Sequence, residues 1–244
     1  MQRSLVCGLT ALAILVLLVP LSASAQLYGD VQQESPRSHQ IALKFGPYLP
    51  NIDGSAYETA FGDDSIFMFR FEYDYQFFKT FGSLAVGFEV GYGSVTGKGQ
   101  AVDDATTSGD ETRLQMVPLA LSLVYALDVM AVRYNIPLVP EFEFGFDWVH
   151  WWIEDGTGET STYSDGVDTF TGAGATLGWH VSVGLKLLLD TMAPNMAQTF
   201  DTEVGVNNSY LFAELLYADI SDFGSDTSWD VGTLTGMFGL AFEF

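Results

Sequence analysis

The sequence predicts an all-β fold, an eight-stranded antiparallel transmembrane β-barrel of the up-and-down type that follows a cleaved signal peptide. In two segments, 67–77 and 233–244, large apolar residues recur at nearly every second position. A period of two places the apolar residues on one face of a strand, which then meets an apolar phase. Hydrophobic residues make up 48% of the chain. Even so, no segment after the N-terminus holds the ~18 consecutive apolar residues of a membrane-spanning helix.

The C-terminal segment makes closure of the sheet necessary. Its apolar face carries Leu234, Phe238, Leu240, Phe242 and Phe244. In a soluble sheet such an aromatic edge strand promotes aggregation. A barrel pairs the last strand with the first and turns the apolar face toward lipid. A lipocalin-like soluble barrel is the nearest alternative, but the aromatic face is too uniform for a small closed core.

The N-terminal 25 residues have the features of a secretory signal peptide. Arg3 supplies the positive charge, residues 9–19 the apolar core and Ala23-Ser24-Ala25 the small residues before cleavage. Cys7 is the only cysteine, so the mature chain is expected to have no disulfide and no cysteine metal site. Residues 26–38 are predicted to form a polar periplasmic tail and residues 39–244 the barrel.

Eight segments carry the expected alternation. We predict strands at 39–46, 67–77, 83–95, 113–127, 136–152, 172–189, 206–218 and 233–244. The strands have about the length, ~9–11 residues, that a tilted membrane strand needs. Strand 206–218 is apolar on both faces, and we orient it so that Glu214 points inward.

The loop lengths set the orientation in the membrane. An even strand number places both termini in the periplasm, and the loops after the first, third, fifth and seventh strands then face outside. Three of these four loops are long, as extracellular loops are. The connector 190–205 is long for a periplasmic turn, and Pro194 could open one short helical turn in it.

Charged residues on the face opposite the aromatic residues cannot face lipid, because an ion at the bilayer midplane costs about 2–4 kcal/mol in a barrel. Lys44 and Glu243 belong to this inward set. We predict a lumen-facing charged cluster of Arg70, Glu72, Asp74, Glu89, Arg113, Glu141, Glu143, Asp147, Lys186 and Glu214.

Two interpretations fit this cluster. An eight-stranded barrel is just wide enough for side chains to fill its interior, so we favour a lumen plugged by ion pairs in which some carboxyl groups share protons. The alternative is a narrow porin-like channel for small solutes or cations, which the excess of inward acids would favour.

The overall charge excludes some partners. All 31 acidic residues follow residue 25, against eight basic ones, which gives the mature chain a net charge of −23. Nucleic-acid binding needs a basic surface and is therefore not expected. Many acids fall in the predicted extracellular loops, where pairs such as Asp63-Asp64 and Asp103-Asp104 stand. Divalent cations or cation-bridged lipopolysaccharide are possible ligands, but no calcium-loop spacing occurs, so we favour a solvated surface.

A third class of function is an outer-membrane lipid-modifying enzyme. Its candidate residues are His150 with Ser161 or Ser164 and Asp155. No spacing fixes a nucleophile beside a base, and His150 shares its face with Phe146 and Trp148. We therefore expect no enzymatic activity and no cofactor.

Three stretches of the sequence are distinctive: Phe45-Gly46-Pro47-Tyr48-Leu49-Pro50-Asn51-Ile52-Asp53, Ile136-Pro137-Leu138-Val139-Pro140 and the run GVNNSYLFAE at 205–214. They resemble a known family of outer-membrane β-barrel domains, found mainly in deltaproteobacteria. The resemblance implies a bacterial outer-membrane barrel and supplies no catalytic residues. In addition, Leu240, Phe242 and the terminal Phe244 resemble the C-terminal signal that barrel-assembly machinery recognises. We expect a structural or surface-interaction role, through acidic extracellular loops, for an integral protein that contacts outer-membrane lipid and lipopolysaccharide.

Overall fold

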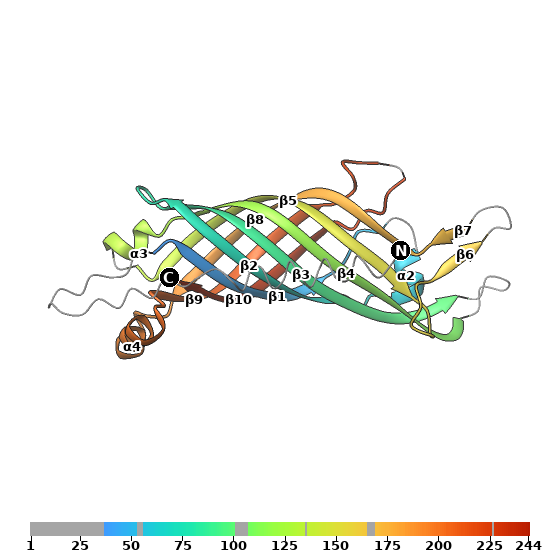
Figure 1. Cartoon of the computed structure of the whole chain (residues 1–244), viewed down its shortest axis with the longest axis horizontal. Helices are drawn as coiled ribbons and strands as arrows, with labels where there is room; N and C mark the ends of the chain where they lie inside the picture. The colour runs from blue at the N-terminus through green and yellow to red at the C-terminus, as the bar shows by residue number, and fades with distance from the viewer. Residues whose placement is uncertain (1–36, 53–55, 101–106, 135, 165–168, 226) are drawn as a thin grey trace. The chain divides into compact units, whose positions relative to one another are not determined.

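The computed structural model describes residues 37–52, 56–100, 107–134, 136–164, 169–225 and 227–244 (Figure 1). The predicted signal peptide, 1–25, and nearly all of the predicted tail lie outside these residues.

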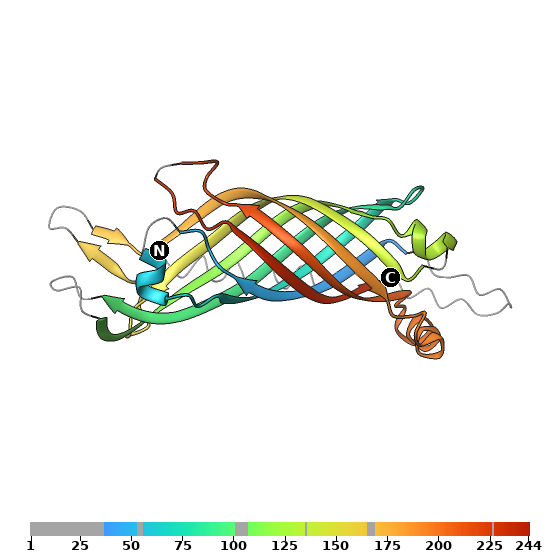
Figure 2. The ribbon, with the colours of Figure 1, turned by 180° about the vertical axis from the view of Figure 1, so that it is seen from behind.

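Eight long strands form one closed antiparallel barrel (Figures 1 and 2). Around the wall, β1 neighbours both β2 and β10, so the first and last strands close the sheet. In the closing pair Ile41 lies opposite Phe242 and Phe45 opposite Phe238. The barrel strands are β1 (His39–Tyr48), β2 (Ile66–Phe78), β3 (Ser83–Gln100), β4 (Thr107–Ala126), β5 (Leu138–Glu154), β8 (Ala173–Leu188), β9 (Asn208–Asp219) and β10 (Thr233–Glu243).

The strands alternate between an exposed apolar outer face and a buried inner face. On β2, Phe69 is 46% exposed whereas Glu72 is only 3% exposed. Aromatic and aliphatic side chains cover the outside of every barrel strand, and charged side chains are buried inside. This is the reverse of a soluble barrel, and it places the wall in an apolar solvent. The predicted fold class is confirmed, including the uncertain orientation of β9.

The predicted loops at the extracellular end contain more structure than expected. We predicted a loop at 96–112, but β3 and β4 continue as a hairpin in which Gly97 pairs with Thr112 and Gln100 with Thr107. The short strands β6 (Thr162–Ser164) and β7 (Thr169–Thr171) pair within the predicted loop 153–171. Where both faces of a strand are in water, backbone pairing does not require alternating apolar residues. The alternating pattern therefore ends before the paired strands do.

Three helices were also missed or underestimated. The first loop contains α2 (Ala56–Phe61), and the turn after β4 contains α3 (Val129–Tyr134). The connector after β8 forms α4 (Pro194–Val204), which has 11 residues rather than one turn. Pro194 opens α4, and Gly205, at φ 79°, ends it in the left-handed conformation that glycine adopts without strain.

The extracellular half of the lumen is filled by an apolar layer. It comprises the buried side chains Tyr48, Tyr57, Phe61, Ile66, Met68, Val95, Leu114, Met116, Val149, Leu216, Ala218, Ile220, Val231 and Met237. Tyr57 and Phe61 belong to α2, which therefore closes this end of the barrel. Tyr48 donates its hydroxyl hydrogen to the carbonyl oxygen of Val231, satisfying a polar pair inside the layer.

Within the described part of the chain, no helix is long and apolar enough to cross a membrane.

Candidate functional site

The centre of the barrel holds a charged layer organised around Lys44 of β1. The Nζ atom of Lys44 lies 2.9 Å from Glu72, 3.1 Å from Glu143, 3.3 Å from Glu89 and 3.4 Å from Glu214. These four carboxylates come from four different strands, so one cation joins β2, β3, β5 and β9 across the lumen. Lys44 itself is only 3% exposed.

Arg70 and His180 complete this layer toward the extracellular end. Arg70 donates from Nη1 to Glu89 at 2.6 Å. The His180 ring lies between Glu143, 3.2 Å from its Nε2, and Asp147, 2.7 Å from its Nδ1. A side chain at Gly145 would collide with the His180 ring and with Ser122. The crowded ring therefore explains why glycine faces the lumen here.

Toward the periplasmic end the layer continues as a chain of contacts. Lys186 forms an ion pair with Glu141 and donates to Gln40 Oε1 at 2.9 Å. Gln40 in turn donates to Asp74 at 2.6 Å. A cavity of about 10 Å³ lies beside Asp74 and Glu141, which is room for about one water molecule.

Acids outnumber cations in the charged layer. Seven buried carboxyl groups share it with Lys44, Arg70, Lys186 and His180. One carboxyl oxygen in each of Glu72, Asp74 and Asp147 has no hydrogen-bond partner among the described residues. Like charges at this density repel each other in a low-dielectric interior, and the ion pairs of Lys44, Arg70 and Lys186 offset part of this repulsion.

Nine of the ten residues predicted for the lumen lie in this layer, and each is at most 8% exposed. Arg113 is the exception, and its prediction was wrong. It is exposed on β4 and lies 3.4 Å from Thr96 Oγ1 at the extracellular end. The physical reason is parity: Arg113 is an even number of residues from Leu119 and Leu121, so it shares their outward face. Its charge is tolerated there because it lies beyond the apolar belt.

Glu243 forms a second polar cluster at the periplasmic end. Its carboxylate accepts hydrogen bonds from Gln76 at 2.9 Å, Asn208 at 2.6 Å and the Tyr210 hydroxyl at 3.2 Å. These neutral donors, from β2 and β9, hold one inward carboxylate beside the end of β10.

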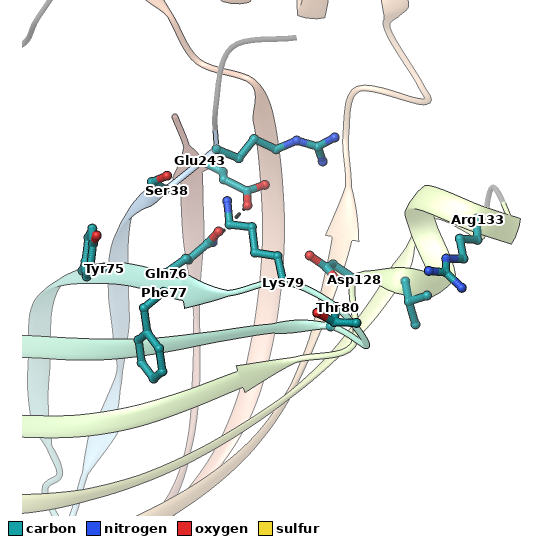
Figure 3. Close-up of a pocket in the computed structure, with 12 residues that line it drawn as sticks. Ser38, Tyr75, Gln76, Phe77, Lys79, Thr80, Asp128, Arg133 and Glu243 are labelled. Carbon is teal, nitrogen blue, oxygen red and sulfur yellow. Dashed lines mark hydrogen bonds between the residues drawn. The ribbon is translucent and has the colours of Figure 1, made fainter.

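A pocket of about 690 Å³ opens next to Glu243 (Figure 3). Its lining includes Arg37, Lys79, Asp128 and Arg133, and Figure 3 shows Gln76 and Lys79 directed toward Glu243. Burial lowers the pKa of Lys79, and Glu243 acts in the opposite direction. Burial raises the pKa of Asp128, with a further increase from Glu243. Sequence patterns did not reveal this pocket, because its lining combines the ends of β2 and β10 with the turn after β2 and with α3, which are distant in sequence.

The candidate residues of the enzyme alternative contact other residues rather than one another. The His150 ring stacks between Trp148 and Trp152, with centroid distances of 6.1 and 5.6 Å. Asp155 accepts hydrogen bonds from Thr157 and Glu159, which lower its pKa. Ser161 forms backbone pairs with Ile153 and Gly172, and the side chain of Ser164 lies outside what the structure describes.

Acidic side chains at the extracellular end mainly shape the loops. Asp222 accepts from the Leu177 amide at 2.7 Å and from the Ser228 hydroxyl. Asp230 accepts from Asn51 at 2.7 Å and from the Gly232 amide at 2.9 Å. Among the described residues, no group of three histidine, cysteine or acidic side chains is placed to hold a metal ion.

Solved structures of small outer-membrane barrels are similar to this chain at low sequence identity. The attachment invasion locus protein Ail of Yersinia pestis, solved with the heparin analogue sucrose octasulfate, is 13% identical, with a TM-score of 0.44 over 85% of this chain and 97% of that one. The N-terminal β-barrel domain of Pseudomonas aeruginosa OprF is 13% identical, with a TM-score of 0.38 over 86% and 100%. A major outer membrane protein from Thermus thermophilus is 13% identical, with a TM-score of 0.37 over 85% and 100%.

No family model matches the chain, and no curated protein matches it in sequence. The assignment therefore rests on the barrel itself. A closed antiparallel wall with an apolar outside and a charged inside is stable only across a bilayer, and this architecture is that of bacterial outer-membrane proteins. The chain is an integral outer-membrane β-barrel.

Several important residues were not singled out by the sequence. Alternation placed Lys44 on the inner face, but it could not show that Lys44 meets four acids or that His180 joins two. These meetings depend on the stagger between strands, which the sequence does not state.

Proposed function

We propose that the protein is an outer-membrane barrel with an occluded lumen and a structural or surface-interaction role carried by its extracellular loops. The observation that carries the proposal is that two barriers, the charged layer and the apolar layer, follow one another along the barrel axis. Any permeating solute would have to separate the ion pairs of Lys44 and then pass the apolar layer under α2.

The apolar layer is the stronger support. Met68 and Met116 are 0% exposed, and Tyr57 and Phe61 of α2 pack on the same cluster. An ion entering an apolar region without polar partners pays a large desolvation cost. A water-filled pathway through this half would require α2 and its loop to leave the barrel.

The extracellular end has the order expected of an interaction surface. The Trp151 and Trp229 rings stack at 4.1 Å with an interplanar angle of 7°, joining β5 to the loop before β10. Asp222 and Asp230 hold the same loop through the hydrogen bonds described above. We propose that this surface contacts the surrounding lipopolysaccharide.

Conductance in planar lipid bilayers tests the proposal. The refolded protein is expected to give no steady unitary steps, while heat-modifiable gel mobility of the same sample shows that the barrel is folded. A known open porin, inserted in parallel, controls for the sensitivity of the bilayer. Steady cation-selective steps would instead establish the alternative, a narrow channel whose selectivity comes from the excess of lumen acids.

We further propose that the protein is not an enzyme. The support is that His150 is engaged between two tryptophans on the outer face and that Asp155 is engaged in its own turn. Mass spectra of lipid A and phospholipids from cells that overproduce the protein are expected to match those of control cells. The proposal would be contradicted if overproduction added or removed an acyl chain and a His150→Ala variant no longer made this change.

The C-terminal strand is proposed to bind the barrel-assembly machinery through Leu240, Phe242 and Phe244. Leu240 and Phe242 lie on the outer face of β10, and the Phe244 ring stacks on His39 at 5.9 Å. A Phe244→Ala variant is expected to fold normally from urea into vesicles but to accumulate less in cells. Equal amounts of variant and wild type in the outer membrane would disprove the signal.

Membership in the barrel family found mainly in deltaproteobacteria stays a proposal based on three motifs. The first motif joins β1 to the loop before β10, because the Asn51 amide donates to Gly232 at 2.8 Å. The third motif supplies Asn208 and Tyr210 to Glu243.

A further inference from the structure

The helix α4 presents an apolar face that no part of the described chain covers. Met196, Phe200 and Val204 recur every four residues, which places them along one side of the helix. They are 63%, 41% and 68% exposed. Gln198 and Thr202 occupy the opposite side and are also exposed. Exposed apolar stripes of this kind mark a surface that meets another apolar phase.

The helix is held in a fixed place at the periplasmic rim. At its start the amides of Met192 and Ala193 donate to the Leu189 carbonyl at 2.8 and 3.3 Å, just after β8. After its end the Asn207 amide donates to the Glu243 carbonyl at 2.7 Å. Both connections tie α4 to strand ends of the barrel.

The direction of α4 leads away from the barrel wall. Figures 1 and 2 both show the helix projecting sideways beyond the edge of the barrel, next to the ends of β8 and β9. In a barrel that crosses a bilayer, a helix at the rim that projects sideways runs along the membrane surface.

The apolar face of α4 continues the lipid-facing belt of the adjoining strands. On the outside of the wall, Leu187 of β8 pairs with Leu211 of β9. Leu185 and Leu211 are each 47% exposed. In the connection from β8 to α4, Leu189 and Met192 are also apolar, and Met192 is 72% exposed.

We propose that α4 is an interfacial helix whose apolar face, formed by Met196, Phe200 and Val204, inserts into the periplasmic leaflet of the outer membrane. The helix carries Asp201 and Glu203 but no lysine or arginine. Attraction to anionic headgroups is therefore absent, and apolar insertion into a zwitterionic lipid surface drives the contact. This inference is independent of whether the lumen conducts.

Single-cysteine labelling tests the proposal cleanly, because Cys7 is the only cysteine in the sequence. In a Cys7→Ser background, Met196→Cys places a fluorophore on the apolar face, and Gln198→Cys places it on the polar face as the matched control. Both proteins are folded into phosphatidylcholine vesicles with and without brominated acyl chains. Heat-modifiable mobility verifies that each barrel is folded.

The label at position 196 is expected to lie about 5–10 Å below the headgroups. Brominated lipid should quench it several-fold more than the label at 198, and aqueous iodide should quench it less. Replacing part of the lipid with phosphatidylglycerol should weaken the difference, because both leaflet and helix are then negative. Equal iodide quenching of the two labels in vesicles would overturn the proposal. The proposal would also be overturned if the label at position 196 were protected from iodide in isolated outer membranes but not in vesicles. A periplasmic protein, rather than lipid, would then cover the apolar face of α4.

Discussion

The two halves of the lumen close the barrel by opposite physical means. The charged layer depends on specific pairs: Lys44 compensates four carboxylates, and each of those groups is buried. The apolar layer depends on shape and burial, and Met68 and Met116 need no partner of a particular charge. Removing one member of a buried ion pair leaves an uncompensated charge, whereas removing one apolar side chain leaves a cavity. The first kind of defect responds to pH, and the second does not.

The largest effect is expected for Lys44→Met, which keeps the length of the side chain and removes its charge. Loss of one partner from a buried pair costs about 3–5 kcal/mol, and here four carboxylates lose their common cation. Urea unfolding from vesicles at pH 8 measures this loss. Acidification to pH 4 should narrow the difference from wild type, because protonated carboxyl groups do not repel each other.

The matched control is Lys98→Met on the exposed β3–β4 hairpin. It removes the same charge from a solvated position and should change stability by less than about 0.5 kcal/mol. If both variants behaved alike, the charged layer would not depend on Lys44.

A smaller and pH-independent effect is expected for Met116→Ala in the apolar layer. Truncating a buried methionine costs about 2–5 kcal/mol through lost transfer energy and the remaining cavity. The loss should be equal at pH 5 and pH 8. On the same strand, Leu121→Ala removes a side chain that is 59% exposed on the outer face and should cost less. A pH-dependent loss at Met116 would mean that the two layers do not act separately.

Tyr48→Phe tests the hydrogen bond that crosses the apolar layer. Without the hydroxyl, the carbonyl of Val231, which is 1% exposed, loses its partner. An unsatisfied buried acceptor costs about 1–3 kcal/mol. Tyr134→Phe on α3, where the ring is 70% exposed, serves as the control. Faster amide exchange at residues 229–232 in the Tyr48 variant alone would locate the effect in the loop before β10.

The smallest effect is expected at the periplasmic mouth, outside both layers. Burial raises the pKa of Asp128, and the negative charge of Glu243 raises it further. Wild type therefore loses stability as pH rises through the folded-state pKa, whereas an Asp128→Asn variant does not. The variant should be slightly more stable at pH 7, by less than about 1 kcal/mol because the group is partly solvated. This gain should disappear below about pH 3.9, the ordinary aspartate value.

The Asp155→Asn variant is expected to show the opposite pH dependence of stability. Hydrogen bonds from Thr157 lower the pKa of Asp155, so its contribution is present above the ordinary aspartate pKa and is lost as pH falls through the folded value. Replacement should therefore reduce stability at pH 7 and have no effect at low pH. A gain at pH 7 would contradict the role of the turn.

The sequence by itself determined the wall of the barrel. Alternation with a period of two assigned the faces of seven strands, because one side meets lipid and the other does not, and the charge of Glu214 assigned the faces of strand 206–218. It also placed the acids of β2, β3 and β5 inside. The same rule explains the error at Arg113, where the charge was given more weight than its position relative to Leu119.

Only the tertiary structure decided what the inner face does. The stagger of the strands brings Lys44 to four carboxylates that are distant in sequence, and it separates them from the methionines of the apolar layer. The hairpin extensions, α2 and α4 form outside the hydrocarbon region. Strands and helices there do not need alternating apolar residues, so the pattern did not predict them. Sequence patterns report the solvent on each side of a strand, whereas the partners across a closed lumen depend on how the strands are shifted against one another.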